Sequence, residues 1–166
     1  QVPLRLAFLF DASLSMYERL GFERRAASRF FADALGPVDQ AALYGVASKA
    51  RLLERLTTSA PTLTDAVSRI DAKGLTSLYD AVLSASKYLS EVDGRRVIVI
   101  LSDGFDTSSK TSETEALKAA QRANIVIYTI SPAGADATTP GRIGRATLQR
   151  FCDQTGGRAF FPVVQS

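Results

Sequence analysis

The sequence contains no histidine and a single cysteine, Cys152. Without histidine, the chain cannot build a Ser-His-Asp or Cys-His catalytic relay and has no imidazole ligand for a metal ion. Zinc sites made from His and Cys are therefore excluded. Any bound metal must be held by oxygen atoms, which points to Mg²⁺, Mn²⁺ or Ca²⁺. One cysteine cannot form an internal disulfide, and we expect Cys152 to be a small buried hydrophobic residue.

Long apolar runs are also missing. No run approaches the ~18–20 residues that cross a bilayer, so we expect no membrane insertion by this segment. The chain has 166 residues, of which 46% are hydrophobic, enough for one globular domain with a substantial core. It begins at Gln1 with neither an initiator Met nor a signal peptide. We therefore expect residues 1–166 to be a single domain cut from a longer chain.

A concentrated basic patch is the third feature that the sequence lacks. The net charge is +3 at pH 7, but the arginines are scattered along the chain. No block of Lys and Arg is interleaved with aromatic residues, the pattern typical of nucleic-acid-binding proteins. The sequence therefore favours solvated helix faces for these cations and predicts no nucleic-acid partner.

Apolar strand-like segments alternate with segments of helical spacing. Such alternation predicts an α/β fold in which a mostly parallel sheet is covered by helices on both faces. Segment 51–56 follows 41–47 too closely for a helical crossover and should pair antiparallel with it. We predict strands at 4–10, 41–47, 51–56, 97–101, 124–130 and 159–164, helices at 18–35, 62–70, 77–89 and 113–123, a long loop at 131–144, and a short helix ending near 154.

Polar residues follow the first and fourth predicted strands. The first strand continues into Asp11, Ser13 and Ser15, and the fourth continues into Asp103. In a Rossmann-like, doubly wound sheet of order 3-2-1-4-5-6, with strand 3 antiparallel at the edge, strands 1 and 4 are neighbours where the strand order reverses. Ligands bind at the carboxyl ends of strands at that point. Two carboxylates and several hydroxyls should therefore converge there without a cation of their own.

These residues resemble those of von Willebrand factor A-type domains, particularly bacterial ones. Asp11, Ser13 and Ser15 match the D-x-S-x-S signature of that family. Thr76 and Asp103 match the Thr and Asp that the family contributes from two further loops to its metal-ion-dependent adhesion site (MIDAS). The resemblance covers essentially the whole chain, and all five positions come in the expected order.

The resemblance implies a function as well as a fold. It implies a non-catalytic protein-binding or adhesion module that holds Mg²⁺ (or Mn²⁺ or Ca²⁺) through Asp11, Ser13, Ser15, Thr76 and Asp103. A partner protein would present an Asp or Glu carboxylate that completes the coordination of the metal. Bacterial relatives with this arrangement are often exported, which favours an extracytoplasmic or cell-envelope location.

The chain departs from the family pattern in three places. Leu14 and Leu75 stand where relatives often have glycine, which puts the loop conformation and access to the metal in question. Relatives usually also end in a helix after the sixth strand, whereas this sequence stops at Ser166. None of these departures removes a ligand.

Simpler structural roles exist for the same residues. Asp11 and Ser13 could cap the following helix by accepting from its free N–H groups, and Asp103 could belong to a turn. Asp106 is interpreted as a solvated loop carboxylate rather than a residue of the site. Asp80 is interpreted as a helix-face residue rather than a ligand.

Two other functions remain open at this stage. A phosphoryl-transfer enzyme of the haloacid dehalogenase type also ends its first strand in a catalytic Asp, but it needs a second acid where this chain has Ser13. A module whose metal only stabilises the fold is the other alternative. A nucleotide-binding domain is disfavoured, because neither G-x-x-x-x-G-K-[ST] nor a complete G-x-G-x-x-G is present.

Overall fold

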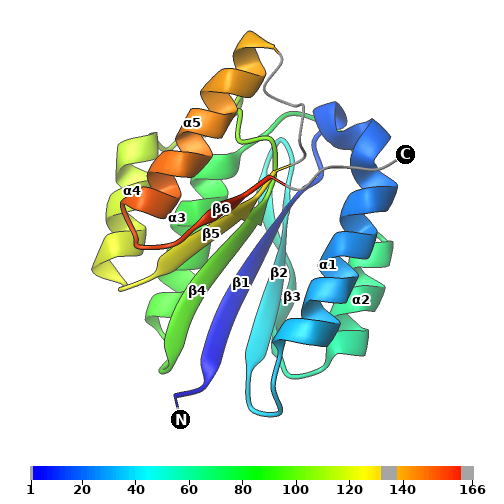
Figure 1. The fold of residues 1–166 in the computed structure, drawn as a ribbon, viewed down its shortest axis with the longest axis vertical. Helices are drawn as coiled ribbons and strands as arrows, with labels where there is room; N and C mark the ends of the chain where they lie inside the picture. The colour runs from blue at the N-terminus through cyan, green and yellow to red at the C-terminus, as the bar shows by residue number, and fades with distance from the viewer. Residues whose placement is uncertain (1, 132–137, 162–166) are drawn as a thin grey trace.

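The computed structural model describes residues 2–131 and 138–161. Strands and helices alternate along most of this range (Figure 1). In chain order the elements are β1 (Leu4–Asp11), the 3-10 helix η1 (Leu14–Arg19), α1 (Leu20–Ala34), β2 (Gln40–Val46), β3 (Ala50–Thr57), α2 (Ala60–Ser68), α3 (Leu78–Ser90), β4 (Arg95–Leu101), α4 (Glu113–Arg122), β5 (Val126–Ile130), α5 (Thr139–Asp153) and β6 (Ala159–Phe160).

Within the described residues the strands form one six-stranded sheet of order β3-β2-β1-β4-β5-β6. All neighbouring pairs are parallel except β2 and β3, which pair antiparallel at the edge. The predicted strand order and the antiparallel third strand are therefore confirmed. The strand order reverses between β1 and β4, which are parallel neighbours, so the carboxyl ends of these two central strands lie side by side (Figure 1).

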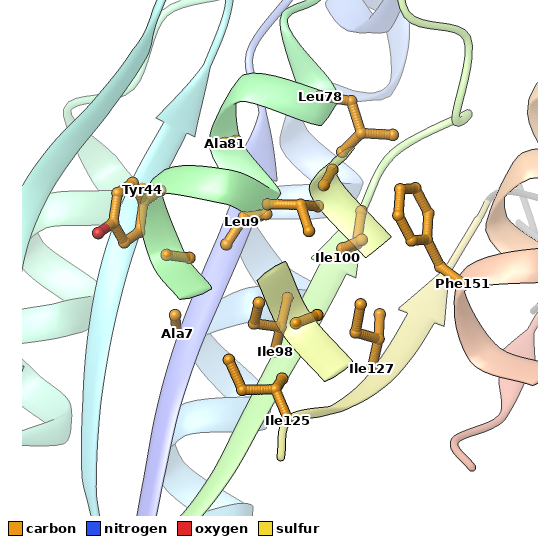
Figure 2. Close-up of a cluster of buried hydrophobic side chains, with 14 of the residues drawn as sticks. Ala7, Leu9, Tyr44, Leu78, Ala81, Ile98, Ile100, Ile125, Ile127 and Phe151 are labelled. Carbon is orange, nitrogen blue, oxygen red and sulfur yellow. The ribbon is translucent and has the colours of Figure 1, made fainter. Parts of the chain in front are cut away.

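One face of the sheet is covered by α3, α4 and α5 (Figure 1). Alternate side chains of β1, β2, β4 and β5 point to this side and pack against the helices. Burying one such side chain stabilises the fold by about 1.5–3 kcal/mol. The cluster, part of which is shown in Figure 2, includes Ala7, Leu9, Tyr44, Leu78, Ala81, Ile98, Ile100, Ile127 and Phe151.

The opposite face is covered by α1 and α2, which lie beside each other in Figure 1. The intervening residues of β1 point to this side, and the buried ring of Phe8 packs against Phe30 and Phe31 of α1, with ring centroids 5.5 and 5.1 Å away. Because helices cover both faces, the central strands are apolar on both sides, which explains their continuous hydrophobic runs.

The predicted boundaries are wrong in two places. The segment after β1 forms the 3-10 helix η1 before α1 begins at Leu20, where a single helix from residue 18 was predicted. Residues 139–144 belong to α5 and not to a loop. The Thr138 side chain accepts a hydrogen bond from the Gly141 N–H and caps the helix, and Pro140 lies in its first turn, a position that tolerates proline.

Two parts of the sequence-based prediction lie outside the described residues. They are positions 132–137 of the predicted loop and positions 162–164 of the last predicted strand. No helix of the described chain is long and apolar enough to span a bilayer.

Candidate metal centre

Asp11 and Ser102 lie next to each other at the carboxyl ends of β1 and β4. Phe10 pairs with Leu101 in the sheet, so the residues that follow, Asp11 and Ser102, lie side by side. The Ser102 hydroxyl donates a hydrogen bond of 2.6 Å to Asp11 Oδ2 and accepts one of 2.9 Å from the Gly104 N–H. Sequence reasoning missed Ser102, although its position directly after the fourth strand was the available signal. Its hydroxyl holds the Asp11 carboxylate in place.

The loop that follows β1 connects the pair of Asp11 and Ser102 to the second carboxylate, that of Asp103. Asp11 Oδ1 accepts a hydrogen bond of 2.9 Å from the Ser13 N–H. The hydroxyls of Ser13 and Ser15 lie 2.9 Å apart, and the Ser15 hydroxyl donates to Asp103 Oδ2 over 3.3 Å. Ser13 precedes η1, but its side chain makes no capping hydrogen bond. Capping is therefore not the role of this hydroxyl, which faces the other polar groups instead.

Backbone hydrogen bonds bring the loop before α3, which carries Thr76, next to the loop formed by residues 11–15. The Leu14 N–H donates to the Gly74 carbonyl over 3.0 Å, and the Lys73 N–H donates to the Ala12 carbonyl over 2.8 Å. On the other side, the Thr107 N–H donates to the Thr76 carbonyl over 2.8 Å. All three loops are therefore joined to one another by main-chain contacts, with the largely buried Thr76 between the other two.

The loops surround a cavity of about 470 Å³. Four of the five predicted site residues line it, namely Ser13, Ser15, Thr76 and Asp103. The fifth, Asp11, is fully buried and lies directly behind Ser13, to which it is hydrogen-bonded. The rest of the wall includes Leu14, Arg19, Leu75, Phe105, Thr138 and Pro140. The structure thus brings the five residues together at one place.

The chemistry of this donor set fits a hard divalent cation. It offers two carboxylates and three hydroxyls, and every donor is an oxygen, as Mg²⁺, Mn²⁺ and Ca²⁺ prefer. No three His, Cys, Asp or Glu side chains converge anywhere in residues 2–131 and 138–161. The two carboxylates together carry a charge of −2, which balances one divalent cation, and the three hydroxyls add neutral oxygen donors.

The environment of Asp11 opposes its negative charge in the metal-free protein. Burial raises the pKa of this carboxyl to about 6, and the neighbouring Asp103 carboxylate contributes to the same shift. Hydrogen bonds from Ser102 and Ser13 lower the pKa but do not offset the burial. A cation beside Asp11 would reverse the balance by stabilising the carboxylate. The site therefore carries an unfavourable charge that a bound cation would compensate.

Glu23 is a second buried acid near the site, and sequence reasoning missed it. Its side chain is fully buried on α1, and neither carboxyl oxygen has a hydrogen-bond partner among the described residues. Burial raises its pKa to about 9, with Asp11 as the next largest cause and Arg19 acting in the opposite direction. The available signal was its spacing, since Glu23 shares the apolar face of the helix with Ala27 and Phe31.

Asp106 and Asp80, the two other acids considered from the sequence, hold the loop between β4 and α4 against α3. Asp106 accepts hydrogen bonds from the Tyr79 N–H (2.9 Å), the Ser109 N–H (3.1 Å) and the Ser109 hydroxyl (2.5 Å). Its interpretation as a solvated loop carboxylate was wrong, because it caps the start of α3 from another loop. Asp80 lies on α3 as predicted, and its carboxylate accepts from the Lys110 and Thr111 N–H groups.

Two glycines let α5 approach the Asp103 loop closely. Gly104 has a φ of +83°, and a Cβ there would lie 2.3 Å from the Gly144 carbonyl oxygen. A Cβ on Gly144 would lie 2.1 Å from the Asp103 carbonyl oxygen and 2.9 Å from the Phe105 nitrogen. Backbone therefore packs on backbone, and the position of α5 is coupled to that of Asp103.

We expect Gly144→Ala to displace this loop. The added methyl group cannot fit without a backbone shift, so the free energy of unfolding should fall by about 1–3 kcal/mol and divalent-ion affinity should fall with it. Urea unfolding and calorimetric titration with MgCl₂ measure the two effects. Gly21→Ala is the matched control, because that glycine lies inside α1 and its Cβ would meet only the Arg25 guanidinium, at 3.5 Å. An unchanged stability in Gly144→Ala would contradict the close packing.

The family comparison agrees with this geometry. A family model described as von Willebrand factor type A domain matches residues 6–105, a range that contains all five candidate site residues. A search among curated proteins gave no match to the sequence.

Solved structures with the same fold come from distant relatives. BatB from Bacteroides thetaiotaomicron is 19% identical, with a TM-score of 0.79, and the alignment covers 98% of this chain and 91% of that one. The pilus adhesin SpaC from Lactobacillus rhamnosus GG is 14% identical, with a TM-score of 0.75 and coverage of 100% and 28%. Proximal thread matrix protein 1 from the mussel byssus, solved with a zinc-occupied MIDAS motif, is 18% identical, with a TM-score of 0.74 and coverage of 96% and 42%. The chain thus spans less than half of the last two proteins.

Proposed function

The chain belongs to the von Willebrand factor type A domain family, and on that premise we propose that it binds a partner protein through one divalent metal ion held at the edge of its sheet. The observation that carries this proposal is the convergence of two carboxylates and three hydroxyls from three loops around one cavity. An interaction role agrees with the family, whose members are mostly adhesion or interaction modules.

Asp11, Ser13, Ser15, Thr76 and Asp103 are the residues that would hold the ion. When bound, the ion would supply a positive charge and an exchangeable coordination position for a partner's oxygen ligand. Mg²⁺ is the ion that this oxygen donor set favours, with Mn²⁺ and Ca²⁺ as alternatives. The mussel protein named above holds zinc in its motif, but this chain has no histidine to favour zinc.

The walls of the cavity suit a carboxylate surrounded by apolar contacts. Leu14 and Leu75, the two departures from the family pattern, are 63% and 55% exposed at the rim, and Phe105 is partly buried beside them. Arg19 also lines the cavity and adds a positive charge near its mouth. A partner Asp or Glu would complete the coordination of the metal, while the leucines exclude water around the contact.

The two alternatives from the sequence are less well supported. Family membership favours the binding module over the haloacid dehalogenase interpretation, and Ser13 occupies the place where such an enzyme needs its second acid. A metal that only stabilises the fold does not explain why the donors line an open cavity with exposed leucines at its rim.

Selection from a random peptide library tests the proposal. Peptides selected on the immobilised domain in MgCl₂ and counter-selected in EDTA should contain an Asp or Glu. Replacing that residue with Ala should weaken binding by roughly 2–5 kcal/mol, the typical effect of truncating one partner of a buried charge pair. The readout is fluorescence anisotropy of the selected peptide. Equal binding in EDTA, or to Asp103→Ala, would show that the metal face is not the binding surface.

A further inference from the structure

A second hollow, of about 570 Å³, adjoins the metal cavity on the α2 side of the sheet. Gly74 lines both, and the adjacent residues Ala12 and Ser13 line one cavity each, so these two segments form the border between them. The Ser48 hydroxyl accepts a hydrogen bond of 3.0 Å from the Leu75 N–H. This contact fixes the β2–β3 turn, one wall of the hollow, to the loop that carries Thr76. The two cavities therefore have a fixed relative position.

The floor of the hollow is apolar and is formed in part by Gly45 of β2 and Leu53 of β3. Leu53 packs directly on Gly45, because a Cβ there would lie 3.0 Å from Leu53 Cδ1 and would push the leucine away. Leu53 lies on the edge strand β3 and is 42% exposed, so part of its side chain is open to a ligand. Ala66 and Ile70, from the end of α2 and just beyond it, complete the apolar surface.

The rim of the hollow is strongly basic. It carries Lys49, Arg51, Arg69 and Lys73 but only one acid, Asp71. The acid pairs with Arg24, which lies outside the hollow, at 3.4 Å, and Arg69 pairs with Asp65 at 2.6 Å. In the described parts of the chain, Lys49, Arg51 and Lys73 form no ion pair. Three cations beside the metal cavity are therefore free to attract an anionic ligand.

We propose that this basic groove, formed by Lys49, Arg51, Arg69 and Lys73 over Gly45 and Leu53, binds an acidic polypeptide segment carrying at least one apolar side chain. The inference extends the proposed function, because the groove would take residues next to the carboxylate that binds the metal. Charge complementarity selects acidic residues, and the uncovered Leu53 selects an apolar one. No aromatic side chain lines the groove for base stacking, which disfavours a single-stranded nucleic acid.

Charge reversal tests the groove with a defined probe, a fluorescein-labelled peptide of alternating Glu and Leu. Lys49→Glu and Arg51→Glu combined should weaken binding about tenfold, because two attractions become repulsions. The matched control combines Lys118→Glu and Arg122→Glu, the same charge change on exposed positions of α4, across the sheet (Figure 1). Anisotropy titrations are run in MgCl₂ and in EDTA, and binding should weaken as salt rises.

The outcomes separate the groove from the metal site. A tenfold loss in the groove variant in both media, with the control within twofold of wild type, supports the groove. Equal losses in both variants would show that only net charge matters, and no loss would remove the groove; either result overturns the proposal. Tighter binding of a single-stranded oligonucleotide of the same charge would also overturn it. Asp103→Ala in MgCl₂ should remove only the metal-dependent part of the binding, and if that part persists the metal site fails while the groove does not.

Discussion

Asp11→Asn is expected to abolish divalent-ion binding and yet to stabilise the metal-free domain. Binding should be lost because Asp11 supplies one of only two carboxylates in the donor set. The metal-free domain should gain stability because the folded pKa of about 6 lies above the ordinary value of 3.8. For an acid whose pKa rises on folding, stability falls as pH rises through this window. At pH 8 the carboxylate therefore costs about 3 kcal/mol, which the neutral amide avoids.

The measurements for this variant are calorimetric titration with MgCl₂ and urea unfolding in EDTA at pH 8. Asp93→Asn is the control, since that residue is exposed and lies on the turn before β4.

For the wild-type domain, ion affinity should fall about tenfold for each pH unit below 6, because one proton must leave Asp11 before the ion binds. Undiminished ion binding in Asp11→Asn would remove Asp11 from the site, and a less stable metal-free variant would contradict the cost of its charge.

Glu23→Gln is expected to raise the free energy of unfolding of the metal-free domain by about 3 kcal/mol at pH 7. The folded pKa of about 9 lies far above the ordinary value of 4.5, so folding must protonate the carboxyl. The wild-type protein should therefore lose stability steadily between pH 4.5 and pH 9, and the variant should not. The difference in the free energy of unfolding between Glu23→Gln and the wild type should be close to zero at pH 4 and largest at pH 9.

Urea unfolding in EDTA across this pH range measures the effect. Glu91→Gln is the matched control, because Glu91 is exposed at the end of α3. Combining Glu23→Gln with Asp11→Asn should give less than the sum of the two gains, since the Asp11 carboxylate is itself one cause of the raised pKa of Glu23. A gain that does not change with pH would mean that Glu23 acts through packing and not through its charge.

Predicting from sequence failed where tertiary contacts decide local structure. The prolines and glycines of 131–144 favoured a loop, but the Thr138 side chain caps a helix there. The glycine at 144 belongs to that helix, and its lack of a side chain is explained only by the carbonyl of Asp103 beside it. Such a contact between residues far apart in the chain leaves no local pattern.

The sequence by itself determined the alternation of strands and helices, the antiparallel edge strand and the loops that carry Asp11, Ser13, Ser15, Thr76 and Asp103, because hydrophobic periodicity and the short connection between 41–47 and 51–56 constrain them. The strand order came with the resemblance to the family, and the structure confirms it. The role of these five residues as metal ligands stays a prediction. Only the tertiary structure revealed Ser102 against Asp11, the unpartnered Glu23 and the basic groove. In each of these, the property that matters is the burial or charge that neighbours from other elements impose on a side chain, and one-dimensional spacing does not encode it.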